Sequence, residues 1–189
     1  MNSYHKTGEQ LREELKLIQE AKKDPARFAV LYDHYYKPVY VFVFRRCGDE
    51  DVAGDIVSAT FLKALLALPK YEFKGVPFSA WLFRIALNEV NMFYRQGEKQ
   101  RHVSLEQTDL SAMITESGAQ DDEERRQELL KALSILKPEE MMMIELRFFE
   151  KRAFAEIAAI VGMTENNAKV KTYRILDKLK TELMKTSLR

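Results

Sequence analysis

Residues 154–183, FAEIAAIVGMTENNAKVKTYRILDKLKTEL, contain the pattern that decides the fold of this part of the chain. Apolar residues recur at helical spacing from Phe154 to Val161, and Gly162 follows where a helix C-terminus favours a residue that can take positive φ. Thr164 then offers an N-cap for a second, longer periodic run. A short helix, a turn containing glycine and a longer second helix form the helix-turn-helix pattern.

The start of the second helix carries the polar side chains that this motif places in the major groove of DNA. Those able to reach base edges and phosphates are Thr164, Glu165, Asn166, Asn167, Lys169 and Lys171. From residue 169 to the end the chain has seven cations and two anions, a net charge of +5, whereas the whole chain has only +1. The charge run alone is more typical of a solvated helix face, but together with the turn it favours phosphate binding.

The composition predicts an all-α protein with real hydrophobic cores. Of the 189 residues 46% are hydrophobic, glycine and proline number only 7 and 5, and the apolar spacing is helical with no convincing strand period. The single cysteine, Cys47, excludes an intrachain disulfide and a cysteine-based metal cluster, and it favours a reduced, cytoplasmic protein. The N-terminus has no apolar signal core, and the most apolar short run, residues 38–44, is too brief to span a membrane.

Two helices are expected before residue 48. Residues 8–23 suit a short, polar helix. Asp24 followed by Pro25 is a helix-start signal, because aspartate caps well and proline fits the first helical position. The helix predicted over residues 25–47 is rich in aromatic residues, and Gly48 is expected to end it.

A third helix is expected from a cap at Asp49 or Asp51 to about residue 67. Its predicted apolar face consists of Val52, Ile56, Val57, Phe61, Leu62 and Leu65. Its other face carries Asp51, Asp55, Ser58 and Lys63.

The segment KYEFKGVPFS, residues 70–79, reads as a loop because Gly75 and Pro77 break helices. Its basic and aromatic residues are Lys70, Tyr71, Phe73 and Lys74. Such residues suit single-stranded nucleic acid, since cations hold the backbone and bases stack on rings. A plain surface loop explains the same residues equally well.

A strongly amphipathic helix is predicted over residues 78–95, with Ser79 as a possible cap. One polar face of this helix is formed at spacings of i, i+4, i+7 and i+11 by Arg84, Asn88, Asn91 and Arg95.

The hydrophobic periodicity fades over residues 96–119, where serine, threonine and acidic residues accumulate. This predicts a flexible, acidic linker. We therefore expect two small helical domains. The predicted parts are an N-terminal extension helix (1–24), a helical bundle (25–96), the linker (97–121) and a helix-turn-helix domain (122–189).

Four segments in this order make the chain resemble the bacterial sigma factors of the extracytoplasmic-function group, the compact two-domain branch of the sigma-70 family. The resemblance covers about residues 28–183. The segments are DVAGDIVSATFLKAL (51–65), FSAWLFRIALNEV (78–90), LKPEEMMMIELRFFE (136–150) and the helix-turn-helix.

The resemblance implies a role for each domain. The first would bind the clamp helices of core RNA polymerase through its third helix, with Asp51, Asp55, Ser58 and Lys63. It would also read the promoter −10 element, capturing a flipped-out base in the loop 70–77 beside the face that begins at Arg84. The C-terminal domain would read the −35 element through residues 164–171, with Arg174 on the DNA backbone. The family further implies regulation by an anti-sigma factor.

The chain departs from the family pattern at several positions. Family members commonly have a Gln-Glu pair where this chain has Ser58 and Ala59, and an acidic residue where it has Met92. Lys171 replaces a frequent arginine and cannot make the bidentate fork to guanine. These departures leave the fold unchanged but predict an unusual promoter.

Two alternatives to a sigma factor are compatible with parts of the sequence. An autonomous helix-turn-helix regulator with an N-terminal sensor bundle would explain the C-terminal domain, but it needs no basic and aromatic loop. An adaptor that binds only protein conflicts with the +5 tail. No enzyme is expected, because the three histidines are scattered and neither a phosphate-binding glycine loop nor a nucleophile–base pair is evident. No metal and no cofactor are expected.

Overall fold

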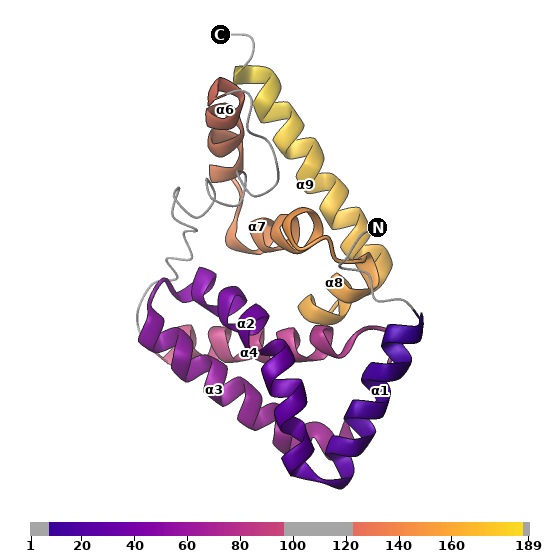
Figure 1. The fold of residues 1–189 in the computed structure, drawn as a ribbon. Coiled ribbons are helices and arrows are strands. Elements are labelled where there is room, and N and C mark those ends of the chain that lie inside the picture. Colours follow the sequence, from indigo (N-terminus) through magenta and orange to yellow (C-terminus); the bar gives the residue numbers. More distant parts are fainter. Residues whose placement is uncertain (1–7, 97–122, 187–189) are drawn as a thin grey trace. The chain divides into compact units, whose positions relative to one another are not determined.

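The computed structural model describes residues 8–96 and 123–186, which form helices and contain no β-strand (Figure 1). The all-α prediction is therefore confirmed. The chain forms two compact units, one built mainly of the helices before residue 97 and the other mainly of those after residue 122. The predicted linker, 97–121, lies outside the described residues, so the domain boundaries remain predictions.

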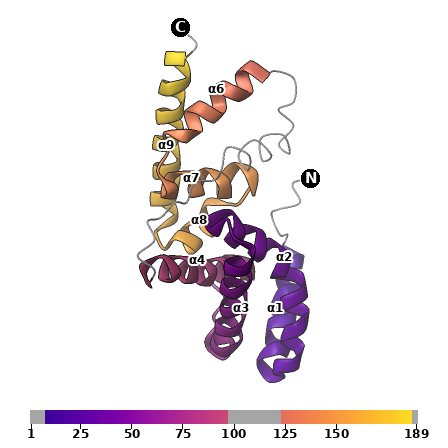
Figure 2. The same ribbon diagram turned by 90° about the vertical axis from the view of Figure 1, so that its left-hand side faces the viewer.

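Within residues 8–96 the first unit has four α-helices and two short 3-10 helices. These are α1 (Gly8–Lys23), η1 (Pro25–Arg27), α2 (Phe28–Cys47), α3 (Glu50–Ala67), η2 (Leu68–Lys70) and α4 (Phe78–Gln96). Helices α2, α3 and α4 pack on one another, and α1 lies beside α2 (Figure 2). At the centre of the core the rings of Phe42 and Phe83 lie 4.6 Å apart, and both are almost completely buried.

Residues 123–186 contain four α-helices and one π-helical turn, most of which belong to the second unit. These are α6 (Glu123–Ser134), α7 (Pro138–Ile144), the turn η3 (Glu145–Phe149), α8 (Phe154–Val161) and α9 (Glu165–Thr186). Its core includes Leu133, Met143, Leu146, Ile157, Ala168, Ile175 and Leu179. Lys178 on α9 donates to the carboxylate of Glu140 on α7 at 2.8 Å. Burial alone would raise the pKa of Glu140, but the hydrogen bonds from Lys178 and from the Lys137 backbone lower it overall.

The local signals at helix ends are mostly confirmed. The Asp49 carboxylate accepts from Val52 N at 3.0 Å and is the N-cap of α3. Gly48 takes φ +66° at the end of α2. Asp24 accepts from Ala26 N at 3.0 Å, but the turn that it caps is the 3-10 helix η1, so α2 begins three residues later than predicted.

Two predictions about local structure were wrong. Ser79 does not cap α4, because the helix begins one residue earlier, at Phe78. Leu62 does not belong to the buried face of α3, since its side chain is 58% exposed. The buried stripe runs through Ala53, Ile56, Val57, Thr60, Phe61 and Ala64. Leu62 is one position beyond Phe61, which rotates it about 100° around the helix and out of the core.

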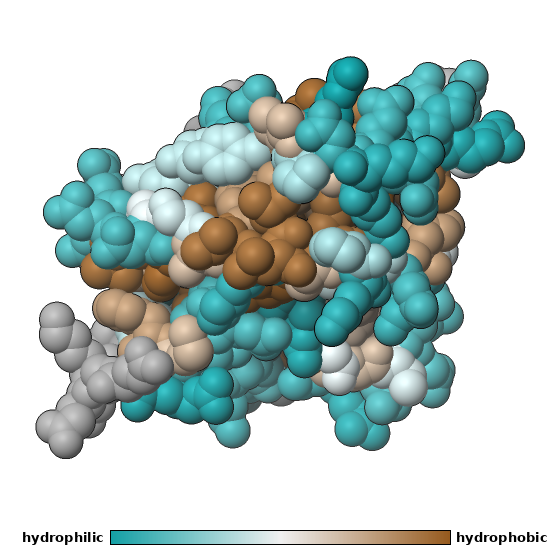
Figure 3. All heavy atoms as spheres, turned by 90° about the horizontal axis from the view of Figure 1, so that it is seen from below, coloured by the Kyte–Doolittle hydropathy of each residue, from teal (hydrophilic) through white to brown (hydrophobic). Residues whose placement is uncertain are grey.

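Among the described residues, the segment Glu50–Lys70 is long and apolar enough to cross a membrane by length and composition alone. Its apolar character has a structural explanation, because α3 packs one face against α2 and α4 and also exposes Leu62 and Leu66. Figure 3 shows apolar residues gathered in the middle of one face of the molecule, with hydrophilic side chains around them.

Candidate nucleic-acid interface

The basic and aromatic residues of the loop between η2 and α4 differ in burial: some are buried and others are exposed. Tyr71 is only 8% exposed, and its ring lies 5.2 Å from that of Phe78 and 4.9 Å from that of Trp81. Burial, with a smaller effect of the Glu14 carboxylate, raises the pKa of Tyr71 to about 12. Phe73 is 41% exposed and Lys74 is also exposed. Phe73, not Tyr71, is therefore the ring that this loop exposes to solvent.

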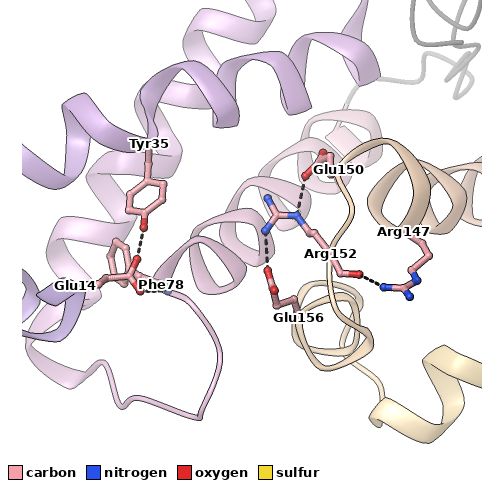
Figure 4. Close-up of polar contacts among 7 residues, drawn as sticks. All are labelled: Glu14, Tyr35, Phe78, Arg147, Glu150, Arg152 and Glu156. Carbon is pink, nitrogen blue, oxygen red and sulfur yellow. Dashed lines mark hydrogen bonds and ion pairs between the residues drawn. The ribbon is translucent and has the colours of Figure 1, made fainter. Parts of the chain in front are cut away.

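Two residues of α1 contact the ends of this loop. The Glu14 carboxylate is 5% exposed and accepts from the Tyr35 hydroxyl through Oε1 and from Phe78 N, at 3.1 Å, through Oε2 (Figure 4). At the other end, Lys22 Nζ donates to the carbonyl oxygen of Tyr71 at 2.6 Å. Local sequence patterns give no signal for either residue, because their partners are 64 and 49 positions away along the chain.

The polar face predicted for α4 is present. Asn88 and Arg95 are exposed, while Arg84 and Asn91 are half-buried. Arg95 Nε donates to the Asn91 carbonyl oxygen at 3.3 Å. Asn88 lies next to Glu89, a buried residue whose carboxylate accepts from Lys63 of α3 at 2.6 Å. The Lys63 ammonium is therefore engaged within the unit, although its side chain is still 48% exposed.

The outer face of α3 combines polar and apolar side chains. Asp51, Asp55 and Ser58 are exposed as predicted. Leu62 and Leu66 continue the same face and are 58% and 72% exposed. The spacing of four, three, four and four residues keeps all five on one side of the helix. Exposed leucines beside carboxylates suit a protein partner better than DNA, since the acidic groups would repel phosphates.

The turn of the helix-turn-helix has the predicted chemistry. Gly162 takes φ +75° after α8, and the Thr164 hydroxyl accepts from Asn167 N at 3.3 Å as the N-cap of α9. Buried Ala168, Thr172 and Ile175 fix which side of α9 faces the core. The exposed residues opposite them are Asn166, Asn167, Lys169, Val170, Lys171, Tyr173 and Arg174. Val170 and Tyr173, which are not among the predicted contact residues, are 41% and 52% exposed on this face.

An ion-pair cluster holds the segment between α7 and α8. Arg152 is 9% exposed, and its guanidinium donates to Glu150 at 2.7 Å and to Glu156 at 3.2 Å (Figure 4). Arg147 donates to the Arg152 carbonyl oxygen at 2.7 Å, and its guanidinium lies 4.5 Å from the centre of the Phe154 ring. These contacts fix the start of α8 and so position the turn that leads into α9.

No group of three or more His, Cys, Asp or Glu side chains within residues 8–96 and 123–186 is arranged to hold a metal ion. The sole cysteine, Cys47, is half-buried, and burial raises the pKa of its thiol above its usual value.

The sequence matches two family models in order along the chain. Sigma-70 region 2 matches residues 31–100, and Sigma-70, region 4 matches residues 126–179. The chain is 30% identical over 155 residues to RNA polymerase sigma factor CarQ of Myxococcus xanthus, with 81% of this chain and 87% of CarQ covered. It is also 30% identical over 164 residues to ECF RNA polymerase sigma factor BldN of Streptomyces coelicolor, with 85% of this chain but only 62% of BldN covered.

Solved structures share the fold. CnrH, solved in complex with the cytosolic domain of CnrY, superposes with a TM-score of 0.60 at 24% identity and covers 90% of this chain and 96% of its own. The sigma factor RpoE from Bartonella quintana, solved with the anti-sigma factor NepR, gives a TM-score of 0.54 at 21% identity and covers 83% and 96%. With both regions matched in order and CarQ aligned over most of both chains, this chain belongs to the extracytoplasmic-function group of the sigma-70 family of RNA polymerase sigma factors.

Proposed function

We propose that this chain binds core RNA polymerase and directs transcription initiation at promoters with −35 and −10 elements, and that it helps to melt the −10 region. The observation that carries this proposal is the presence of sigma-70 regions 2 and 4, in that order, on one chain. The comparisons give no support to the autonomous regulator, because CarQ and BldN are both sigma factors.

In our proposal the −10 element meets the first unit at the loop before α4 and the polar face of α4. Phe73 offers the exposed ring and Lys74 the cation, while Asn88 offers an amide at the surface. Taking a base out of the stack costs a few kcal/mol, which stacking on a ring and hydrogen bonds to an amide can offset. The full set of proposed contacts is Lys70, Phe73, Lys74, Arg84, Asn88, Asn91 and Arg95. Tyr71 acts beneath this surface as part of the core.

The −35 element would meet the first turns of α9. Lys169, Lys171 and Arg174 are exposed cations that suit phosphates or guanine, and Asn166 and Asn167 are amides that suit adenine. The Thr164 hydroxyl is engaged as the N-cap, so it orders the helix end that approaches DNA. Val170 offers an apolar contact of the kind that thymine methyl groups accept.

Core polymerase would dock on the outer face of α3. Asp51, Asp55 and Ser58 supply polar contacts, and the exposed side chains of Leu62 and Leu66 supply apolar area near the centre of the interface. Lys63 borders this face, and its ion pair with Glu89 connects α3 to the helix that carries Asn88.

An anti-sigma factor is a further proposed partner. Two structural relatives were solved with other chains bound, CnrH with the cytosolic domain of CnrY and RpoE with the anti-sigma factor NepR. A protein that covers α3 or the −10 face would block promoter use without any change in this chain. We propose a cytoplasmic, non-enzymatic role, since the relatives' names describe factors that act with RNA polymerase.

The test is run-off transcription with purified core polymerase on a promoter library, with and without the chain. We expect transcripts that require the chain and that start downstream of two shared sequence elements. Asp177→Ala, a change on α9 beyond the proposed contacts, serves as a control that should leave the selected promoters unchanged. Failure of the wild-type chain both to yield transcripts and to co-elute with core polymerase would contradict the proposal.

A further inference from the structure

We propose that α1 is a clamp for the −10 loop, in which Glu14 and Lys22 are positioning residues for base capture. This inference rests on the proposed function, because it gives α1 a task in promoter opening. The residues that would touch the base lie on the loop and on α4, whereas Glu14 and Lys22 act only through the backbone of the loop.

The first anchor is at the C-terminal end of the loop. Phe78 is the first residue of α4, so its N–H has no acceptor within the helix. The Glu14 carboxylate accepts this hydrogen bond at 3.1 Å and also brings a negative charge to the positive end of the helix dipole. Glu14 is itself 5% exposed and held by the Tyr35 hydroxyl, so it cannot swing away without breaking that contact.

The second anchor is at the N-terminal end of the loop. Lys22 Nζ donates to the Tyr71 carbonyl oxygen at 2.6 Å and lies 6.0 Å from the centre of the Tyr71 ring. That ring packs against Phe78 and Trp81, so the two ends of the loop also meet through their side chains. Both anchors come from one helix whose buried face includes Ile18 and Ala21.

The segment between the anchors has no regular secondary structure. Residues 71–77 form no helix, Gly75 takes φ +76°, and residues 72–75 are exposed. Only the two ends are tied to the core, so the anchors determine where Phe73 and Lys74 stand relative to Asn88. Holding a loop in its binding geometry lowers the entropy lost on binding and places the groups that discriminate between bases.

The clamp is not part of the match to sigma-70 region 2, which begins at residue 31. Helix α1 therefore adds to this unit two polar contacts with the loop that the matched region cannot supply.

The experiment uses holoenzyme assembled from core polymerase and the full chain, on a promoter that the wild-type chain opens. A fluorescent base analogue in the −10 element reports the opening rate on two templates, one with the preferred base at the captured position and one with a substituted base. Discrimination is the ratio of the two rates. A general loss of folded protein lowers both rates together and leaves this ratio unchanged.

Lys22→Met removes the donor but keeps the apolar stem, and Lys22→Arg restores a donor. We expect Lys22→Met to lower discrimination about three- to tenfold, the net effect of one ordinary hydrogen bond, and Lys22→Arg to recover most of it. Glu14→Gln should act in the same direction. The matched controls are Lys23→Met and Glu13→Gln, which change exposed neighbours on the same helix and should leave discrimination unchanged.

A double-mutant cycle separates the clamp from an unrelated defect. In a Phe73→Ala background the loop has lost its exposed ring, so Lys22→Met should lower discrimination little further. If Lys22→Met leaves discrimination unchanged, even with both opening rates lowered equally, the clamp is overturned while the proposed function stays intact. A wild-type chain that opens no promoter would overturn both, and this result is visible before any variant is made.

Discussion

The ammonium nitrogen of Lys63 on α3 lies 2.6 Å from Oε2 of Glu89 on α4. The Glu89 side chain is 8% exposed and that of Lys63 is 48% exposed, so the pair brings a buried carboxylate to a cation at the surface. It joins the helix proposed to contact polymerase to the helix proposed to read the −10 element.

Lys63→Met should destabilise the chain by about 1–2 kcal/mol, because it leaves the buried Glu89 carboxylate without its cation. Water screens the exposed Lys63 side of the pair, so the loss of stability should be smaller than for a fully buried ion pair. Urea denaturation measures it. The double variant Lys63→Met/Glu89→Gln should recover part of the loss, and no recovery would contradict this account of the pair.

Replacing two glycines by alanine should change stability in opposite directions. Gly48 has φ +66° and Gly54 lies within α3, and at both positions an added Cβ meets no atom within 4 Å. Gly48→Ala should therefore cost about 1 kcal/mol through its backbone conformation alone, whereas Gly54→Ala should gain about 0.5–1 kcal/mol in a helix interior. Thermal denaturation of the two variants tests the prediction, and shifts of the same sign would contradict it.

Thr164→Ala should lower the stability of the second unit by about 1 kcal/mol, since it removes the N-cap of α9. Thr164→Ser keeps a hydroxyl at the cap and should retain most of this stability. Thr181→Ala is the control, because Thr181 lies inside α9, where its hydroxyl donates to the Asp177 carbonyl oxygen, and alanine is the better helix former there. Circular dichroism on heating measures the stability of each variant. Equal losses of stability in Thr164→Ala and Thr181→Ala would argue against the cap.

Tyr71 should make folding sensitive to alkaline pH. Its pKa is about 12 in the folded chain, compared with an ordinary value of 10.0 for tyrosine. Because the folded value is the higher one, its contribution to stability is fully present below pH 10 and is lost as the pH rises towards 12. Tyr71→Phe keeps the ring and should remove this part of the alkaline loss. Urea denaturation of both chains across this pH range measures the difference, and equal alkaline losses would contradict the prediction.

Lys74→Ala and Asn88→Ala should reduce promoter opening more than binding to core polymerase. Both side chains are exposed on the proposed −10 face, and neither belongs to α3. Loss of one phosphate contact or one base contact should cost about 1–3 kcal/mol on the promoter. Opening rates and polymerase affinity are measured on the same preparations, with Lys16→Ala as an exposed control. An equal loss in both measurements would count against this assignment.

The sequence predicted most of what depends on residues close together along the chain. Helical periodicity gave the all-α class, and the cap residues Asp49, Gly162 and Thr164 marked helix ends correctly. The start of α9 and its exposed polar residues also followed from local spacing, because a helix fixes which residues share a face. The family resemblance rested on the order of such local segments, and the matches to regions 2 and 4 agree with it.

The tertiary structure decided which of several equivalent residues became core. Tyr71 and Phe73 are both aromatic residues of one loop, but only packing against Phe78 and Trp81 buries the first and leaves the second exposed. Leu62 fits a hydrophobic pattern and still faces outward, because α2 and α4 cover the neighbouring stripe of α3.

The contacts of Glu14 and Lys22 had no signal in the sequence. A glutamate and a lysine on a polar helix read as solvated residues, and only the fold brings them to partners 64 and 49 positions away. Helix formation is governed by interactions within a few residues, so the sequence alone determined the helices, their order and the helix-turn-helix. Burial and long-range hydrogen bonds depend on how helices pack, so only the tertiary structure decided how the −10 loop is held.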